Sequence, residues 1–172
     1  RQIQFHQLYY HTRDHIALVQ RRSRLIFNAI RSDLTVDAVE QIERLLDLCV
    51  IAHDMIQVFE AETQPHMARQ RVMGVSETAT LERLLNYIDV HCSAAMSDLD
   101  QAAIRSAISA TICAYDTKEQ AIYQPALNQP NLSIVARILA LADLGALGID
   151  GISAYNREGS LLFLEENLDV IP

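Results

Sequence analysis

Apolar residues recur at three- and four-residue spacing along most of the chain, which is the spacing of an amphipathic helix. No stretch alternates apolar and polar residues for long enough to predict a strand. Gly and Pro are scarce, and Trp is absent. The pattern predicts an all-α fold, a helical bundle with no substantial sheet, in which residues 1–172 form a single domain.

The first two predicted helices lead to a buried histidine. Thr12 caps a helix that runs to about Ile30, and Thr35 caps the next one. The apolar stripe of the second helix consists of Val39, Ile42, Leu46, Cys49, Val50 and His53. This stripe directs His53 toward the core.

Two further helices follow a more polar segment. That segment starts after Asp54, contains Pro65 and Gly74, and is expected to be a loop with a short helix. Ser76 opens a third helix, whose inward residues are Leu81, Leu84, Leu85 and Ile88. Ser97-x-x-Asp100 is a variant of the capping box and opens a fourth, whose stripe is Leu99, Ala103, Ile104, Ile108 and Ile112.

The last third of the chain contains a proline-bearing connection over residues 123–131 and two more helices. Leu132, Ala136, Leu139 and Asp143 share one face of the first of these. Gly145, Gly148 and Gly151 separate it from a final helix over about Arg157–Leu168. Glu165 and Glu166 are interpreted as solvated charges, and the segment 146–172 is expected to pack beside any pocket.

Composition excludes several classes of protein. The 172 residues carry a net charge of −8, with a pI near 5.1, which argues against a nucleic-acid polymer as partner. We find no membrane span and no signal peptide, although the chain begins with Arg1 and an upstream portion is left open. Cys49, Cys92 and Cys113 are far apart and odd in number, which favours reduced core thiols and a cytoplasmic protein. The aliphatic content is compatible with a homodimer.

The dipeptide His53-Asp54 is the strongest chemical signal. It closes an apolar run over residues 45–52, where a histidine and an aspartate are costly to bury unless a divalent cation neutralises them. Asp143 also lies on the buried face of an aliphatic helix, with no Lys or Arg within one turn. It either bonds a neighbouring backbone group or has a partner from elsewhere in the fold. His11 and His15 have the spacing of residues on one helical face.

Three motifs together resemble the HD-domain superfamily of metal-dependent phosphohydrolases. They are Tyr-His-Thr-Arg-Asp-His at 10–15, Ala-His-Asp at 52–54 and Leu-Ala-Asp-Leu-Gly at 141–145, which span a motif core of about 10–145. The resemblance implies an HD-domain-like bundle with a metal site in its core, and the ligands would be His15, His53, Asp54 and Asp143.

The first motif also looks like the Tyr-His-Asn-x-x-His of the cyclic nucleotide phosphodiesterases in that superfamily, although Thr12 stands in place of the Asn. By resemblance, His11 donates a proton to the leaving oxygen. Glu77 matches a glutamate that positions water in several HD hydrolases, or it is a first-turn glutamate favoured by the helix dipole. Arg69 and Arg71 are candidates for binding a substrate phosphate, or they are solvated loop charges.

One metal is expected rather than two. His66 and His91 are the histidines available for a second site, and they lack the paired arrangement that such HD proteins have. Thr111 and Tyr115 occupy the helix in which a further ligand would be sought, and His6 is an ordinary surface or packing residue. The cofactor is one divalent ion, Mn, Mg, Co, Ni, Fe or Zn, because a His₂Asp₂ set accepts them all.

These expectations lead to one main function and two alternatives. The main one is hydrolysis of a phosphate ester of a nucleotide or small phosphorylated metabolite by metal-bound hydroxide, with His11, Asp54 and Glu77 as catalytic residues. The first alternative is a catalytically silent nucleotide-binding or regulatory module. The second is a structural bundle whose buried His and Asp side chains pair with each other.

Overall fold

The computed structural model of the protein describes residues 7–60 and 67–170. The long helices are α1 (Arg13–Ile30), α2 (Val36–Ala52), α3 (Val75–His91), α4 (Asp98–Ala110), α5 (Ile134–Asp143) and α6 (Ile152–Glu166). Strands β1 (Ala114–Asp116) and β2 (Ala121–Tyr123) form an antiparallel hairpin in which Tyr115 pairs with Ile122. The predicted all-α class is confirmed, and this hairpin is the small exception.

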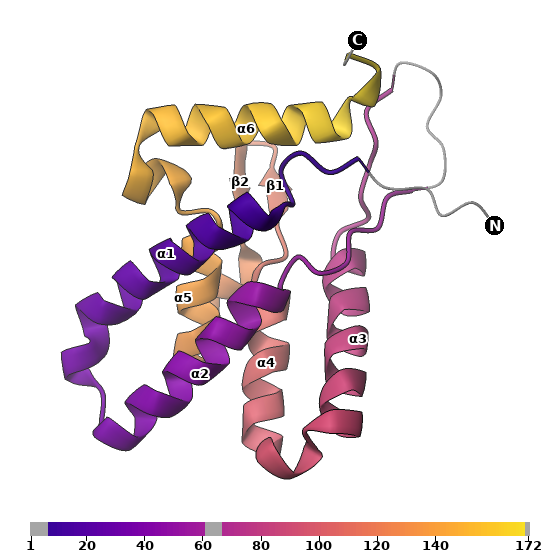
Figure 1. Cartoon of the computed structure of the whole chain (residues 1–172). Helices are drawn as coiled ribbons and strands as arrows, with labels where there is room; N and C mark the ends of the chain where they lie inside the picture. Colours follow the sequence, from indigo (N-terminus) through magenta and orange to yellow (C-terminus); the bar gives the residue numbers. More distant parts are fainter. Residues whose placement is uncertain (1–6, 61–66, 171–172) are drawn as a thin grey trace.

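Helix α5 lies at the centre of the bundle. It contacts α1, α2 and α4, while α3 packs against α4 and α6 lies across the end where α1 begins (Figure 1). A helix with neighbours on several sides must be apolar nearly all round, and α5 reads Ile-Val-Ala-Arg-Ile-Leu-Ala-Leu-Ala-Asp. Its first turn is fixed by Ser133, whose hydroxyl accepts a hydrogen bond from the amide of Ala136.

The core of the described residues combines the inward faces of these helices. Its most deeply buried side chains include Val19, Phe27, Leu46, Cys49, Val50, Ile88, Ile104, Ile108, Ile138 and Leu139. The stripe predicted for α2 is largely correct, because Val39, Leu46, Cys49, Val50 and His53 are all buried. His53 is the C-cap residue of α2, so its side chain enters the core at the end of that helix.

Several predicted details of the helix starts are wrong. Helix α6 begins at Ile152 rather than near Arg157, because a single π-helical turn over Ala146–Asp150 leads into Gly151, which turns the chain at φ 84°. Gly74, not Ser76, precedes α3. The Ser76 hydroxyl instead accepts a hydrogen bond from the amide of Val58.

The region around α4 contains one confirmed cap and two errors. Ser97 and Asp100 form the predicted capping box. Leu99 is 79% exposed rather than inward, because it lies in the first turn on the outer side of the helix. The helix ends at Ala110, so Ile112 lies beyond it and Tyr115 belongs to β1. The short helix expected after Asp54 is absent from residues 55–60 and 67–74.

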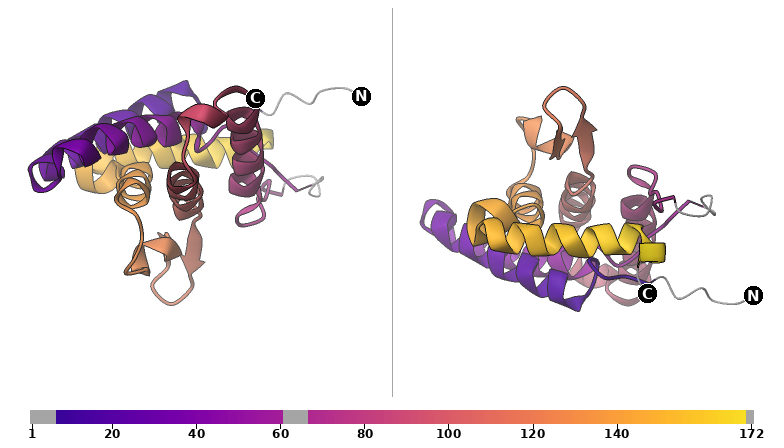
Figure 2. Two further views of the ribbon diagram at one scale, coloured as in Figure 1. Left: turned by 90° about the horizontal axis from the view of Figure 1, so that it is seen from below. Right: turned by 90° about the horizontal axis from the view of Figure 1, so that it is seen from above.

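The hairpin projects from the ends of α4 and α5, on the side away from α1 and α2 (Figure 2). Its turn is held by Asp116, whose carboxylate accepts hydrogen bonds from the amides of Lys118 and Glu119. No helix of the described chain is both long enough and apolar enough to cross a bilayer.

Candidate metal centre

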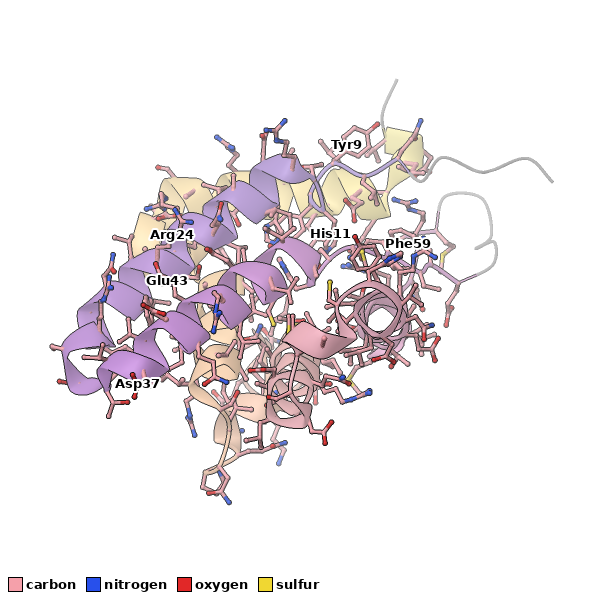
Figure 3. The ribbon with its side chains drawn as sticks, turned by 60° about the horizontal axis from the view of Figure 1, so that its bottom comes forward. Tyr9, His11, Arg24, Asp37, Glu43 and Phe59 are labelled. Atoms are coloured by element: carbon pink, nitrogen blue, oxygen red, sulfur yellow. The ribbon has the colours of Figure 1, made fainter. Side chains whose placement is uncertain are left out.

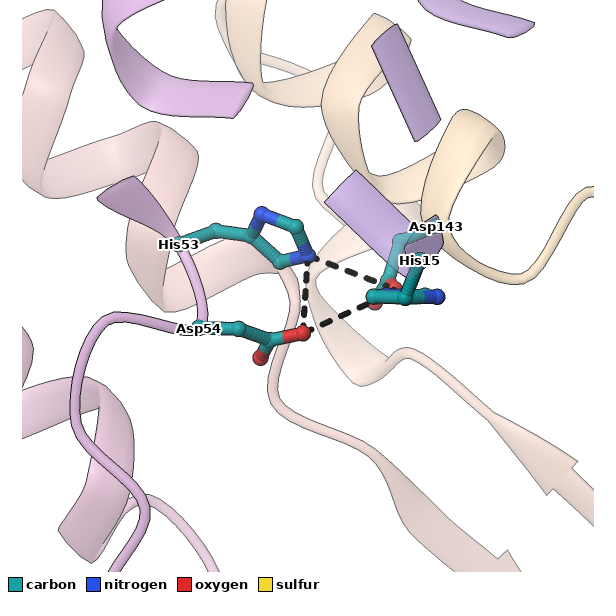
Figure 4. A group of neighbouring side chains, drawn as sticks. All are labelled: His15, His53, Asp54 and Asp143. Atoms are coloured by element: carbon teal, nitrogen blue, oxygen red, sulfur yellow. Dashed lines mark ion pairs between the residues drawn. The ribbon is translucent and has the colours of Figure 1, made fainter. Parts of the chain in front are cut away.

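Four side chains from three helices converge on one point inside the bundle. They are His15 near the start of α1, His53 and Asp54 at the end of α2, and Asp143 at the end of α5. One ligand atom from each side chain lies within 4.8 Å of all the others (Figure 4). The sequence-predicted ligand set is therefore brought together.

The spacing of these atoms suits a small divalent ion. Asp54 Oδ2 lies 3.2 Å from His15 Nε2 and 3.1 Å from His53 Nε2. Asp143 Oδ1 lies 3.3 and 3.6 Å from the same two nitrogens. Ligands about 2.1 Å from one ion are about 3.0–3.4 Å apart at neighbouring positions, so the observed separations are close to the edges of a coordination shell.

The atoms that face the centre lack hydrogen bonds. His15 Nε2, His53 Nε2 and Asp54 Oδ2 are buried and have no hydrogen-bond partner, because their close contacts do not have hydrogen-bond geometry. Buried polar atoms without partners are costly, and three of them aimed at one point are what a cation site requires. The residues present therefore fit a divalent ion.

The outward atom of each carboxylate is already occupied by a glutamine amide. Gln57 Nε2 donates to Asp54 Oδ1 at 3.2 Å, and Gln124 Nε2 donates to Asp143 Oδ2 at 3.3 Å. Each carboxylate is thus oriented by one oxygen and offers the other to the centre. Neither glutamine was identified from the sequence, and Gln124, just before Pro125, gave no signal that could have found it.

The imidazole of His53 is oriented in the same way. Its Nδ1 lies 2.8 Å from the carbonyl oxygen of Val50 and donates to it, which leaves the lone pair of Nε2 for the centre.

In the absence of an ion, the four side chains compensate one another electrostatically. Burial opposes protonation of His15, but Asp143 and Asp54 raise its pKa to about 9. The pKa of His53 is likewise raised, against the effect of burial, by the same two carboxylates. Burial favours neutral carboxyl groups, yet the two histidines lower the pKa values of Asp54 and Asp143. A cation and protons therefore compete for the two imidazoles and two carboxylates of the cluster.

A second group of charges lies behind His15. Its Nδ1 has no hydrogen bond, and Oε2 of Glu158 in α6 is 4.0 Å away. Glu158 is buried and pairs with the fully buried guanidinium of Arg22, which also bonds Asp150 in the π-helical turn. These residues connect α1, the turn and α6 beside the metal ligand.

His11 lies just before α1 and faces α6. Its Nδ1 is 2.5 Å from Oε1 of Glu165, and Oε2 of the same glutamate accepts hydrogen bonds from the amides of Tyr9, Tyr10 and His11. Burial opposes the ionisation of Glu165, but these contacts, His11 first, lower its pKa to about 2. Figure 3 shows His11 between α6 and the segment that carries Phe59.

The sequence interpretation of Glu165 is wrong. It was expected to be a solvated charge, yet its exposed fraction is 0%. The helical spacing of seven residues between Glu158 and Glu165, which places both on one face, was the signal that could have revealed these two residues. Glu166 is half-buried and forms an ion pair with Arg71 at 3.4 Å.

A cavity of about 560 Å³ opens beside the candidate metal centre. Its wall includes Asp54, Asp143, His11, Glu77 and Arg71. Glu77 lies in the first turn of α3, and its pKa is raised by burial and by the charges of Asp54 and Asp143. The predicted catalytic residues His11, Asp54 and Glu77 thus line one cavity together with Asp143, while the candidate ligands His15 and His53 lie behind its wall.

The two predicted substrate arginines have different roles. Arg69 donates through Nε to the carbonyl oxygen of Glu165 at 2.9 Å and through Nη2 to that of Gln7 at 2.9 Å, and it lies 3.8 Å from the centre of the Phe59 ring. Its guanidinium therefore links the backbone of α6 at Glu165 to the backbone of the segment before α1 at Gln7. The hydrogen bonds of the Arg71 guanidinium to described residues go to side chains: its Nη1 lies 2.9 Å from His11 Nε2 and 3.0 Å from Gln57 Oε1.

Among the described residues, no further histidine joins the cluster. His91 is exposed at the end of α3, and among the described residues the His and Asp side chains that could hold an ion are the four above. His6 and His66 lie outside the described residues.

Comparison with known proteins does not place the chain in a family. No protein-family model matches it, and no curated protein and no solved structure shows significant similarity. The function is therefore inferred from the residues of the candidate metal centre and its cavity.

Proposed function

We propose that the protein is a metal-dependent phosphohydrolase that cleaves a phosphate ester of a nucleotide or small phosphorylated metabolite. The observation that carries the proposal is the convergence of His15, His53, Asp54 and Asp143 on one point, where atoms of the first three lack hydrogen bonds. The two aspartates also line the neighbouring cavity. The same four residues carry the resemblance to the HD-domain superfamily. The geometry supports a cation site, and the resemblance is what points from that site to phosphate-ester hydrolysis.

A divalent ion in this site supplies Lewis acidity: it lowers the pKa of a coordinated water and neutralises charge that develops on a phosphoryl oxygen. The protein's part is to hold the ligands in place and to position the other reactants. Glu77, on the cavity wall and with a raised pKa, is suited to accept a proton from the attacking water.

His11 is the proposed proton donor to the leaving oxygen. Arginine always donates, so the 2.9 Å contact makes His11 Nε2 the acceptor from Arg71, while Nδ1–H donates to Glu165. When Arg71 turns to a substrate phosphate, Nε2 is free to carry a proton, and the carboxylate of Glu165 stabilises the resulting imidazolium.

The test is turnover of phenyl phosphate and bis(p-nitrophenyl) phosphate with Mn²⁺, Mg²⁺, Co²⁺ or Ni²⁺, in the wild type and in Asp54→Ala. Replacing a ligand that holds the ion lowers kcat/KM by at least about two orders of magnitude, since the loss of a residue that merely orients a ligand already costs 10–100-fold. The matched control is Asp47→Ala, which removes a partly exposed carboxylate from the same helix. Activity that survives both a chelator and Asp54→Ala would refute the mechanism.

The first alternative is a binding module that does not turn its ligand over. Thermal stabilisation of the metal-loaded protein by phosphate esters, without any product, would favour it. The structural alternative predicts a protein that contains no metal and takes up none, which metal analysis of the purified protein decides.

A further inference from the structure

The cavity beside the metal centre carries unusually little positive charge for a phosphate site. Arg69 and Arg71 are the guanidinium groups among its described wall residues, and the carboxyl groups of Asp54, Asp143, Glu77 and Glu166 face the same space. A divalent ion offsets the two aspartates. The remaining charges on the cavity wall, those of Arg69, Arg71, Glu77 and Glu166, sum to about zero before any substrate enters.

Of the two arginines, Arg71 is the one that can exchange its present partners for a substrate. The donors of Arg69 are used by the backbone carbonyl groups of Glu165 and Gln7, and its guanidinium lies on the Phe59 ring. Releasing it would take this partner from the carbonyl oxygen of the buried Glu165, which is costly. Within the described residues, the guanidinium of Arg71 is bound by side chains alone, and its 3.4 Å contact with Glu166 is long for a hydrogen bond.

The outer wall of the cavity is apolar. Val72, Met73, Ile122 and Leu144 line it, and each is more than 40% exposed. They come from the loop before α3, from β2 and from the end of α5, so segments far apart in the chain build one apolar rim. Exposed apolar side chains gathered at the mouth of a polar cavity are suited to an apolar ligand surface.

We propose that the cavity takes a substrate with a single phosphoryl group on a body with an apolar face, and that it rejects chains of phosphates. This rests on the proposed function, because it places the phosphoryl group between the metal centre and Arg71. A second phosphate would bring more negative charge beside Glu77 and Glu166, and the described cavity wall offers no further cation to meet it. The apolar body lies against Val72, Met73 and Ile122.

The test is calorimetric titration of the Mn²⁺-loaded protein with methyl phosphate, phenyl phosphate and phenyl diphosphate. Phenyl phosphate should bind at least about tenfold more tightly than phenyl diphosphate, because of the added charge. It should also bind several-fold more tightly than methyl phosphate, because of the apolar rim. Glu166→Gln removes part of the repulsion and should lower the preference for the monophosphate. Glu82→Gln, an exposed position on α3 outside the cavity wall, should leave it unchanged.

The outcomes separate the two proposals. Phenyl diphosphate binding as tightly as phenyl phosphate, or an unchanged preference in Glu166→Gln, overturns the single-phosphate inference and leaves the phosphohydrolase standing. Failure of all three probes to bind the metal-loaded protein overturns both. Chelation of free Mn²⁺ by the diphosphate is the same for every variant, so the change between variants reports on the cavity alone.

Discussion

At the scale of single residues, the site is defined by how each polar atom is used. His53 turns one nitrogen to a carbonyl oxygen and the other to the centre, and each aspartate turns one oxygen to a glutamine and the other to the centre. His11 is different, because both of its nitrogens are engaged, one by Glu165 and one by Arg71. It therefore offers no unbonded nitrogen to an ion, and the role that we propose for it is proton transfer.

A proton donor is revealed by the leaving group of the substrate. In His11→Gln, hydrolysis of phenyl phosphate should fall about a hundredfold or more, since general acid catalysis contributes about 10²–10⁴-fold. Hydrolysis of p-nitrophenyl phosphate should fall much less, because nitrophenolate leaves without a proton. Steady-state kinetics with both esters measures the difference.

Glu165→Gln provides the comparison for His11→Gln. It keeps the shape of the side chain that contacts His11 but removes the charge that stabilises the imidazolium, so it should show the same dependence on leaving group to a smaller extent. Equal losses for the two esters in His11→Gln would mean that His11 contributes to binding or folding rather than to proton transfer.

At the scale of elements, α6 places a glutamate next to each of the two histidines in the first motif, His11 and His15. Glu158 and Glu165 lie on one face of this helix, the first beside His15 and the second bonded to His11. Glu158 Oε2 lies 4.0 Å from His15 Nδ1, beyond hydrogen-bond distance, so it acts on His15 through its charge, and we expect this charge to favour the binding of an ion by His15.

Glu158→Gln should weaken the affinity for Mn²⁺ or Co²⁺ by about 10–100-fold, as measured by calorimetry on the folded protein. The matched control is Asp150→Asn. It removes the other carboxylate that Arg22 bonds but leaves Glu158 beside His15, so it should lower thermal stability with little change in metal affinity. Equal affinities in Glu158→Gln and wild type would show that Glu158 only neutralises Arg22.

The difference between α2 and α6 shows what could be predicted from the sequence. The inward position of His53 follows from local apolar spacing, and the isolated Asp143 on an apolar helix indicates a partner from elsewhere. Glu165 was misjudged because its partners are more than 150 residues away in the chain, and an acidic residue in a final helix is usually solvated. The hairpin was missed because its strands are only three residues long, too short for alternation to be visible.

At the scale of the whole molecule, the candidate metal centre joins helices that are distant in sequence. α1, α2 and α5 each present at least one ligand at one end, next to the apolar core that they share. An ion bound there links three helices, and the site does not exist in the unfolded chain. Metal binding should therefore be coupled to folding stability.

Addition of Mn²⁺ or Co²⁺ to the chelator-treated protein should raise its melting temperature. At an ion concentration about 100 times Kd the gain is about 2.7 kcal/mol, which corresponds to about 5–11 °C for a domain of this size. Asp143→Asn keeps the size of the side chain but removes a charged ligand, so its melting temperature should shift far less. Asp89→Asn, at an exposed position on α3, should behave as the wild type does.

If the wild type and Asp143→Asn respond equally, the ion binds elsewhere. If neither responds, the four side chains pair with one another as a structural cluster, in which the two carboxylates hold His15 and His53 by charge.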